Sequence, residues 1–413
     1  MKINNPKLIR STFDEMIARW TAIGYYQKEL VSANLMTNLD MSKSFELFVS
    51  DIESIRGDLF INNGTHLRNT EFGNKNKNHY YATTYAIKWF PFDFIFKKFL
   101  IFLEMNNYFF VELNSRFFLF FYYFNINVEI LEMIDNESFV YCYKLDEING
   151  VVLNRIKMEV ISKSMQNVNC IDDMDGSQKE LINQIVKCYK ANAKCNKINN
   201  RIDSNFEKKR NGYIEYFFKI LNKYKGAYAF SVNFYIKKTN IAFDFPKIRN
   251  DFFNTLRGHS KTASIVGYMG TWEYCEKHDF FFRAVFFVPK KIIDEPQEFL
   301  DGLIYLWETF NNSKSNERQN LIFKAELSNI SESIQSLKTP YLFIGQKKQT
   351  LLESFVDSVI NYTVLAEKYF FPAELQIFIF EHMLEHHKVK NSDNKFIIDK
   401  LKNSFSRSFR GHL

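Results

Sequence analysis

One string in the last part of the chain has the residue types and spacing of a zinc-binding helix. In His382-Met-Leu-Glu385-His386 the two histidines are four positions apart, so a helix would place them on one face. Zinc hydrolysis also needs a third protein ligand and a substrate cleft. The 27 residues that follow contain two carboxylate side chains, Asp393 and Asp399. We therefore interpret the string as the polar end of a helix that binds metal adventitiously at most.

Other familiar chemical motifs are missing from the sequence. None of the five cysteines belongs to a CxxC pair, and their odd number favours reduced thiols in a cytosol. No nucleotide-binding glycine loop and no GxSxG string occurs, so the usual nucleotide and serine-hydrolase sites are not indicated. The segment from Met1 to Trp20 lacks an apolar run, and the hydrophobic stretch from Trp89 to Leu131 is interrupted by charges. We therefore expect a cytoplasmic protein without membrane contact.

Positive charge is concentrated in the second half of the chain. The 413 residues include 54 basic and 47 acidic side chains, a net charge of +7. Residues 1–200 hold 23 of each sign, so the whole excess follows residue 200. Residues 186–240 hold 13 basic and 3 acidic side chains, and residues 386–413 hold 7 and 2. Two such clusters predict a polyanionic partner, although a solvated helix face gives the same pattern.

The basic side chains that we expect to contact nucleic acid lie mainly in these clusters. Tyrosines such as Tyr216 and Tyr224 accompany the lysines and could stack on bases. An amphipathic helix with its aromatic side chains in the core would have the same sequence, and we favour that interpretation of the tyrosines. The candidate contact residues are Lys208, Lys209, Arg210, Lys219, Lys223, Lys237, Lys238, Lys347, Lys348, Arg407 and Arg410.

Hydrophobic periodicity predicts an α+β fold for the second half. In chain order it indicates a helix over 214–224, a strand over 227–237, a helix over 246–256, strands over 264–274 and 280–288, and a helix over 294–310. Asp294 is the expected N-cap of the last helix, with Pro296 in its first turn. Because a short turn joins the two adjacent strands, we expect an antiparallel sheet with flanking helices.

The first half has a different character and is expected to form a separate, aromatic-rich α/β domain. Helical patterns follow Ser11 and cover residues 42–55, and aromatic, strand-like runs extend from Tyr80 to Tyr143. Charge and aromatic density change between residues 165 and 210. We therefore predict domains at 1–185 and 186–348, followed by a basic, helical tail at 349–413.

The string from Gly267 to Glu273, GYMGTWE, is followed by a short turn and by the aromatic run Phe280–Phe287. This pattern resembles the core of the filamentous-phage (inovirus) gene-two-type protein family, which is similar to rolling-circle replication initiators, the HUH endonucleases. The segment YLFIGQKK from Tyr341 and the string RSFRG, which ends at Gly411, resemble later motifs of that family. The resemblance covers about residues 212–348 and the last few residues, and its motifs are short.

The resemblance implies a replication-initiator-like domain with a metal site and a tyrosine nucleophile. In the family, a His-x-His strand and a carboxylate hold Mg²⁺ or Mn²⁺ near the scissile phosphate. Here that strand carries Phe280, Phe281, Phe282 and Arg283, and Asn233 stands where the family has an acidic residue. The candidate metal ligands that remain are Glu273 and His278. The candidate nucleophiles are Tyr341, by its position in the motif, and Tyr362, on an expected helix.

Three hypotheses follow from the sequence. The leading one is a DNA-binding protein of phage or mobile-element origin that contacts single-stranded or origin-like duplex DNA and has a degenerate nuclease site. An alternative is an active, metal-dependent DNA-nicking enzyme with a rebuilt site that uses Mg²⁺ or Mn²⁺. A third is a non-enzymatic protein-interaction or phage-defence component, in which the first half of the chain docks a protein partner.

Overall fold

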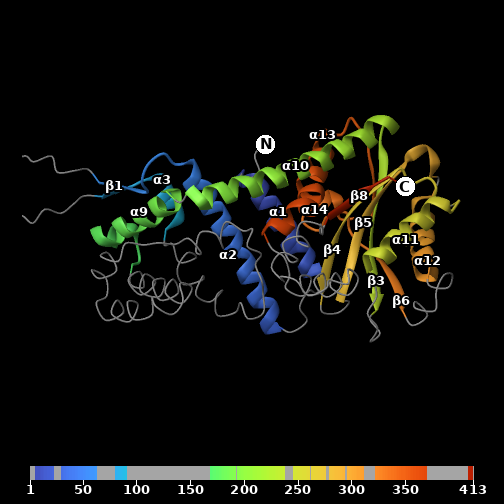
Figure 1. Cartoon of the computed structure of the whole chain (residues 1–413), viewed down its shortest axis with the longest axis horizontal. Helices are drawn as coiled ribbons and strands as arrows, with labels where there is room; N and C mark the ends of the chain where they lie inside the picture. The colour runs from blue at the N-terminus through green and yellow to red at the C-terminus, as the bar shows by residue number, and fades with distance from the viewer. Residues whose placement is uncertain are drawn as a thin grey trace, which may run out of the picture. The chain divides into compact units, whose positions relative to one another are not determined.

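The protein is described by a computed structural model, shown in Figure 1. The described residues are 5–22, 29–62, 80–90, 168–191, 193–237, 245–260, 262–275, 279–293, 295–310, 321–369 and 408–412. The chain divides into two compact units. The first, here called the sheet unit, comprises Met1–Ile3, Arg10–Met36 and Asn205–Leu413, and the second comprises Asn4–Ile9 and Thr37–Ser204. The sheet unit therefore takes residues from all three segments that the sequence predicts as domains.

An antiparallel sheet forms the centre of the sheet unit. Its strands have the order β6-β3-β5-β4-β8, and β7 also pairs with β3. All of these pairs are antiparallel. The predicted α+β fold with an antiparallel sheet and flanking helices is thus confirmed. The strands are β3 (Ala227–Lys237), β4 (Gly267–Cys275), β5 (Asp279–Pro289), β6 (Ile322–Leu327), β7 (Tyr341–Ile344) and β8 (Ser408–Gly411).

Helices flank this sheet. They are α1 (Pro6–Ala22), the end of α10 (Ala193–Tyr224), α11 (Phe245–Gly258), α12 (Pro296–Thr309), α13 (Gln349–Phe355) and α14 (Asn361–Tyr369). A π-helical turn, Val356–Ile360, joins α13 to α14. The turn between α10 and β3 uses Lys225 with φ 56° and Gly226 with φ 120°. Glycine is required at the second position because a Cβ there would lie 2.8 Å from the Phe343 ring.

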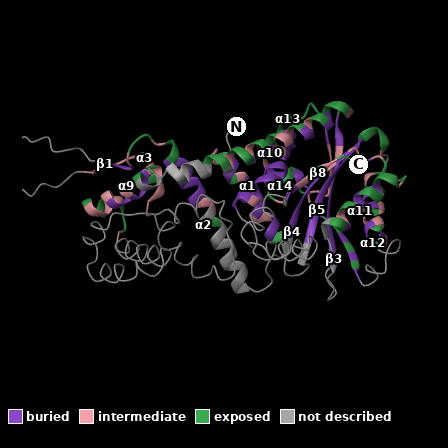
Figure 2. Cartoon of the chain, in the orientation of Figure 1, coloured by how far each residue is buried: buried purple, intermediate pink, exposed green. Residues whose placement is uncertain are grey.

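Strand alternation gives the sheet one apolar face and a second face on which buried polar side chains lie among apolar ones. We call the second face the polar face. On the apolar face, Phe234 stacks on Phe282 at 4.9 Å. Trp307 of α12 meets Phe234 edge-on, and Phe252 of α11 meets it at a tilt. The Trp307 indole also donates a hydrogen bond to the Lys324 carbonyl at 2.9 Å. Figure 2 shows the strands as largely buried, with exposed residues on the outer sides of α11 and α12. This face holds the aromatic core of the sheet unit.

The second unit contains a short two-stranded sheet and helices. Its elements are α2 (Glu29–Ser54, which begins in the sheet unit), β1 (Phe60–Asn62), β2 (Tyr80–Ala82), α3 (Thr84–Trp89) and α9 (Gly176–Ala191). The buried Asn183 side chain bonds both backbone groups of Phe60, at 2.6 and 2.9 Å, and so attaches α9 to β1. Among the described residues, no helix is long and apolar enough to cross a membrane.

Three local predictions are corrected by the structure. The first helix begins at Pro6 rather than after Ser11, because the Asn5 side chain accepts a hydrogen bond from the Lys7 amide at 2.9 Å and proline suits the first helical position. Of the strand-like runs expected from Tyr80 to Tyr143, the first, β2, ends at Ala82, because the Thr83 hydroxyl accepts from the Ala86 amide and caps α3. Residues 91–143 of that prediction lie outside the described residues. The N-cap of α12 is Glu295, not Asp294.

Candidate functional site

The polar face of the sheet carries several of the residues that the sequence analysis named as candidates for chemistry. In the strand register, Arg283 of β5 is paired with Asn233 of β3 and with Thr271 of β4. Glu273 lies two positions beyond Thr271 and therefore points to the same face. Asn233, Glu273 and Arg283 are 5%, 2% and 2% exposed. Burying a charge of either sign costs free energy unless the charge is paired or hydrogen-bonded. The partners of Glu273 and Arg283 therefore decide what this face can do.

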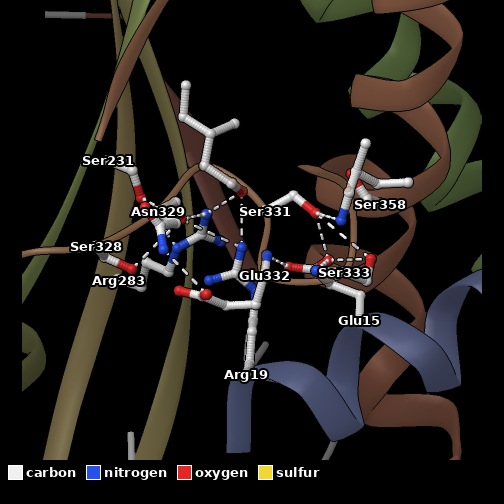
Figure 3. A network of polar contacts seen from close by, with 12 residues as sticks. Glu15, Arg19, Ser231, Arg283, Ser328, Asn329, Ser331, Glu332, Ser333 and Ser358 are labelled. Atoms are coloured by element: carbon white, nitrogen blue, oxygen red, sulfur yellow. Dashed lines mark hydrogen bonds and ion pairs between the residues drawn. The ribbon is translucent and has the colours of Figure 1, made fainter. Parts of the chain in front are cut away.

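Two arginines, one from the sheet and one from α1, share acceptors in the loop after β6 (Figure 3). Arg283 donates to the Ser231 hydroxyl at 3.1 Å and to the carbonyls of Asn329 and Ile330 at 3.1 and 2.5 Å. Arg19 donates to the Ile330 carbonyl at 2.7 Å. The two guanidinium groups thus donate hydrogen bonds to the Asn329 and Ile330 carbonyls and hold this loop against the sheet.

Glu15 of α1 lies beside these arginines and accepts hydrogen bonds from the same loop. Its carboxylate receives the amides of Glu332 and Ser333 at 2.9 and 3.0 Å, and the hydroxyls of Ser331 and Ser333 at 2.5 and 2.6 Å. It also forms an ion pair with Arg19 at 2.6 Å. Burial by itself would raise the pKa of Glu15, but the Arg19 charge and these hydrogen bonds outweigh it, and the pKa is lowered.

Glu273 interacts electrostatically with both guanidinium groups. Burial and the neighbouring Arg19 lower the pKa of Arg283 to about 9, and the carboxylates of Glu273 and Glu15 act in the opposite direction. Burial also disfavours the charged form of Arg19, but Glu15 and Glu273 outweigh it and raise the pKa of Arg19. Both guanidinium groups are therefore charged at neutral pH, and the two carboxylates neutralise them. The Glu273 Oε1 atom has no hydrogen-bond partner among the described residues.

This arrangement bears on the proposed metal site. Glu273 interacts electrostatically with the guanidinium groups of Arg19 and Arg283, and these cations repel a divalent metal ion. The described part of the chain has no group of three or more histidine, cysteine, aspartate or glutamate side chains that could hold a metal ion. His278, the second ligand candidate, lies outside the described residues, as does the His382–His386 string. The described surroundings of Glu273 thus favour arginine over Mg²⁺ or Mn²⁺ as its counter-charge.

The two candidate nucleophiles lie on opposite faces of the sheet. Tyr362 of α14 is fully buried, with its ring 5.1 Å from the Arg19 guanidinium carbon, and belongs to the polar face. Tyr341 of β7 is paired with Phe230 and packs against the apolar core. The structure therefore brings Tyr362, but not Tyr341, to the side of the sheet that carries Glu273.

A second set of charged residues gathers at one end of the sheet. The first residue of β3, Ala227, is paired with Pro289 at the end of β5 and with Ile344 at the end of β7. This register brings together three pairs of exposed lysines: Lys223 and Lys225, Lys290 and Lys291, and Lys347 and Lys348. We call these six residues the lysine end. The segments 222–228, 288–293 and 341–349 contain no carboxylate side chain, so nothing within them neutralises the lysines.

Aromatic side chains pack next to the lysine end. The Lys290 ammonium group lies 5.2 Å from the centre of the Phe343 ring, and Phe343 meets Tyr228 edge-on at 5.4 Å. The Gln346 side chain donates to the Leu221 carbonyl at 3.1 Å and so fixes the loop after β7 against the end of α10. The rings are engaged in packing, whereas the six lysine residues are exposed.

The other predicted contact residues have different surroundings. Lys208 and Lys219 on α10, and Arg410 on β8, are exposed. Lys209 instead pairs with Glu367 at 3.2 Å, and the buried Arg210 donates to Asn361 at 2.7 Å, so both already have partners within the protein. Lys238, Arg407 and the side chain of Lys237 lie outside the described residues.

Sequence reasoning missed half of the lysine end. It did not include Lys225, Lys290 or Lys291 among the contact candidates. Lys290 and Lys291 follow the predicted strand 280–288 after a single proline, but pairing of that strand with β3, which brings these lysines to the lysine end, was not predicted. It also missed Glu15 and Arg19, whose partners are more than 300 positions away.

Comparison of the chain with protein-family models, with curated proteins and with solved structures gave no match.

Proposed function

We propose that this protein binds DNA through the lysine end, in the manner expected of a relative of rolling-circle replication initiators from a phage or mobile element. The observation that carries the proposal is the convergence of six exposed lysines from three segments with no carboxylate among them. Each ammonium group can neutralise one phosphate and release a counterion, which favours binding of a polyanion irrespective of its sequence.

The polar face supports binding without strand cleavage. The Tyr362 hydroxyl is buried, and the charge next to Glu273 comes from arginines. An attacking tyrosine must reach a phosphorus atom, so this geometry favours a nuclease site that has become structural. If the protein does nick DNA, incubation with Mg²⁺ or Mn²⁺ will give cleaved strands and a covalent protein–DNA adduct that is lost in Tyr362→Phe. We expect neither product.

The test of binding is a salt titration with a labelled oligonucleotide. With about six phosphate contacts, the affinity should fall by roughly a thousandfold between 50 and 200 mM salt. The double variant Lys290→Gln and Lys347→Gln should reduce the slope of log K against log salt by about two. The matched control, Lys324→Gln with Lys338→Gln, removes the same charge from exposed lysines outside the lysine end and should leave the slope unchanged.

Two results would contradict the proposal. One is the absence of binding to single-stranded and duplex DNA at 50 mM salt. The other is an equal loss of affinity in the control and in the lysine-end variant, because net charge rather than the placed lysines would then be responsible.

A further inference from the structure

The last five turns of α10 expose a single narrow stripe of side chains. Between residues 205 and 224, all of which are described, the exposed positions are Asn205, Lys208, Asn211, Glu215, Lys219, Asn222 and Lys223. They recur every three or four residues and therefore lie along one side of the helix. Figure 2 shows this exposed side alternating with the buried side of the helix.

The stripe is basic, and a residue from a distant strand completes it. It holds three lysines and one carboxylate, Glu215. Arg410 of β8 donates a hydrogen bond to the Gly212 carbonyl and lies over the rings of Tyr213 and Tyr216, at 4.9 and 5.4 Å. Its exposed guanidinium group thus occupies the gap between Lys208 and Lys219. We call Lys208, Arg410, Lys219 and Lys223 the α10 track.

The α10 track leads directly into the lysine end. At 1.5 Å per residue, the fifteen positions from Lys208 to Lys223 span about 22 Å. Lys223 belongs to both sets, and Lys225 follows it in the turn before β3. The cations therefore form one line rather than two separate patches.

We propose that the α10 track and the lysine end form one continuous binding surface for a polynucleotide backbone, so that the preferred ligand is a long strand rather than a short one. This inference rests on the proposed DNA binding. At 3.4 Å per phosphate along one strand of a duplex, the track alone spans about six or seven phosphates. Because Tyr213 and Tyr216 are buried beneath Arg410, the track contacts phosphates and does not read bases.

The experiment measures affinity against oligonucleotide length at 100 mM salt. The ligands are labelled, mixed-sequence DNA strands of about 4 and about 20 nucleotides, the shorter being within reach of the lysine end alone. The variant Lys208→Gln with Lys219→Gln should weaken binding of the longer strand by about tenfold or more, because each lost phosphate contact is worth nearly a tenfold change at this salt. Binding of the shorter strand should not change.

The same helix offers a control variant that removes a negative charge and should have the opposite effect on binding. Glu215 lies on the stripe between Arg410 and Lys219, so Glu215→Gln should strengthen binding of the longer strand and leave the shorter one unaffected. Circular dichroism verifies that each variant remains folded. Since all three residues are exposed and on a helix surface, we expect the variants to unfold at nearly the same temperature as the wild-type protein.

The outcomes separate the two proposals. If the wild-type protein binds both strands but the track variants change neither, or change both equally, the continuous surface is disproved and DNA binding by the lysine end stands. If the wild-type protein binds neither strand, both proposals fail. Tighter binding to vesicles rich in anionic lipid than to the longer strand would also overturn the inference, because the surface would then be a lipid-binding one.

Discussion

At the scale of single residues, the polar face holds four buried charges that interact with one another. Arg19, Arg283, Glu15 and Glu273 are nearly inaccessible to water, and their formal charges sum to zero. Removing one member of such a set costs about 3–5 kcal/mol, because it leaves an opposite charge buried without a partner. The set therefore holds α1 and the loop 328–334 on the sheet, and its contribution depends on Glu15 remaining ionised.

Glu15→Gln tests this dependence on ionisation. The pKa of Glu15 is lowered in the folded protein, so the carboxylate contributes stability above its ordinary pKa of about 4.3, and this contribution is lost as the pH falls through the folded-state pKa. We expect the variant to lose about 3 kcal/mol at pH 7 and progressively less below pH 4. Urea denaturation of the variant and the wild-type protein, at pH 7 and below pH 4, measures the difference in the free energy of unfolding. A deficit that does not depend on pH would show that packing, not charge, is what the substitution removes.

Only part of this site could be predicted from the sequence. Period-two alternation is sufficient to place Asn233, Glu273 and Arg283 on one face, because it needs no knowledge of distant contacts. Arg19 could not be assigned to that face, since it reaches the Ile330 carbonyl across 311 positions. The burial of Tyr362 could not be predicted either, because a single tyrosine on a helix does not show by itself whether it faces the core or solvent.

At the scale of elements, β8 depends on close approaches to its neighbours. The Tyr216 hydroxyl donates to the Gly411 carbonyl and accepts from the Tyr268 amide at 3.0 Å. The ring of Phe409 lies against Gly270, where a Cβ would come within 2.5 Å of the ring and closer still to the Arg283 carbonyl. The resemblance singled out this last string, but local pattern did not predict that it would be a sheet strand, because four residues carry little periodicity.

Gly270→Ala tests the fit of β8. The added methyl group must displace either Phe409 or the β5 backbone, so we expect a loss of about 1–3 kcal/mol. The matched control is Gly258→Ala at the end of α11, where a Cβ meets nothing within 4 Å. Thermal unfolding compares the two variants. Equal melting temperatures for Gly270→Ala and the wild-type protein would mean that β8 does not pack as described.

The central elements were the easiest to predict. The predicted strand over 227–237 has the same bounds as β3, and the predicted pair over 264–274 and 280–288 corresponds to β4 and β5. Their aromatic and β-branched runs end at clear turn signals. The position of α1 against this sheet could not be predicted, because the helical pattern of its sequence does not specify a partner that lies hundreds of residues away.

At the scale of the whole molecule, stability should be unevenly distributed. β3 and β5 are paired on both sides, whereas β6 and β8 lie at the edges of the sheet. Hydrogen exchange should therefore be slowest for the amides of β3 and β5, with β6 and β8 exchanging through smaller openings. Mass spectrometry of peptides after exchange measures this order. Exchange of β5 as fast as that of β8 would contradict the central position of β5.

The strand β8 has a consequence for how the protein is made. Tyr216 meets Gly411 across 195 positions, and Glu15 meets Ser331 across 316. Contacts of such long range slow folding, because closing the intervening chain into a loop costs conformational entropy before the contact forms. While a ribosome is still adding residues before Ser408, the β4 edge has no strand to pair with and its backbone groups remain available to other chains. Newly made copies should therefore be most prone to aggregate in the interval before Gly411 is added.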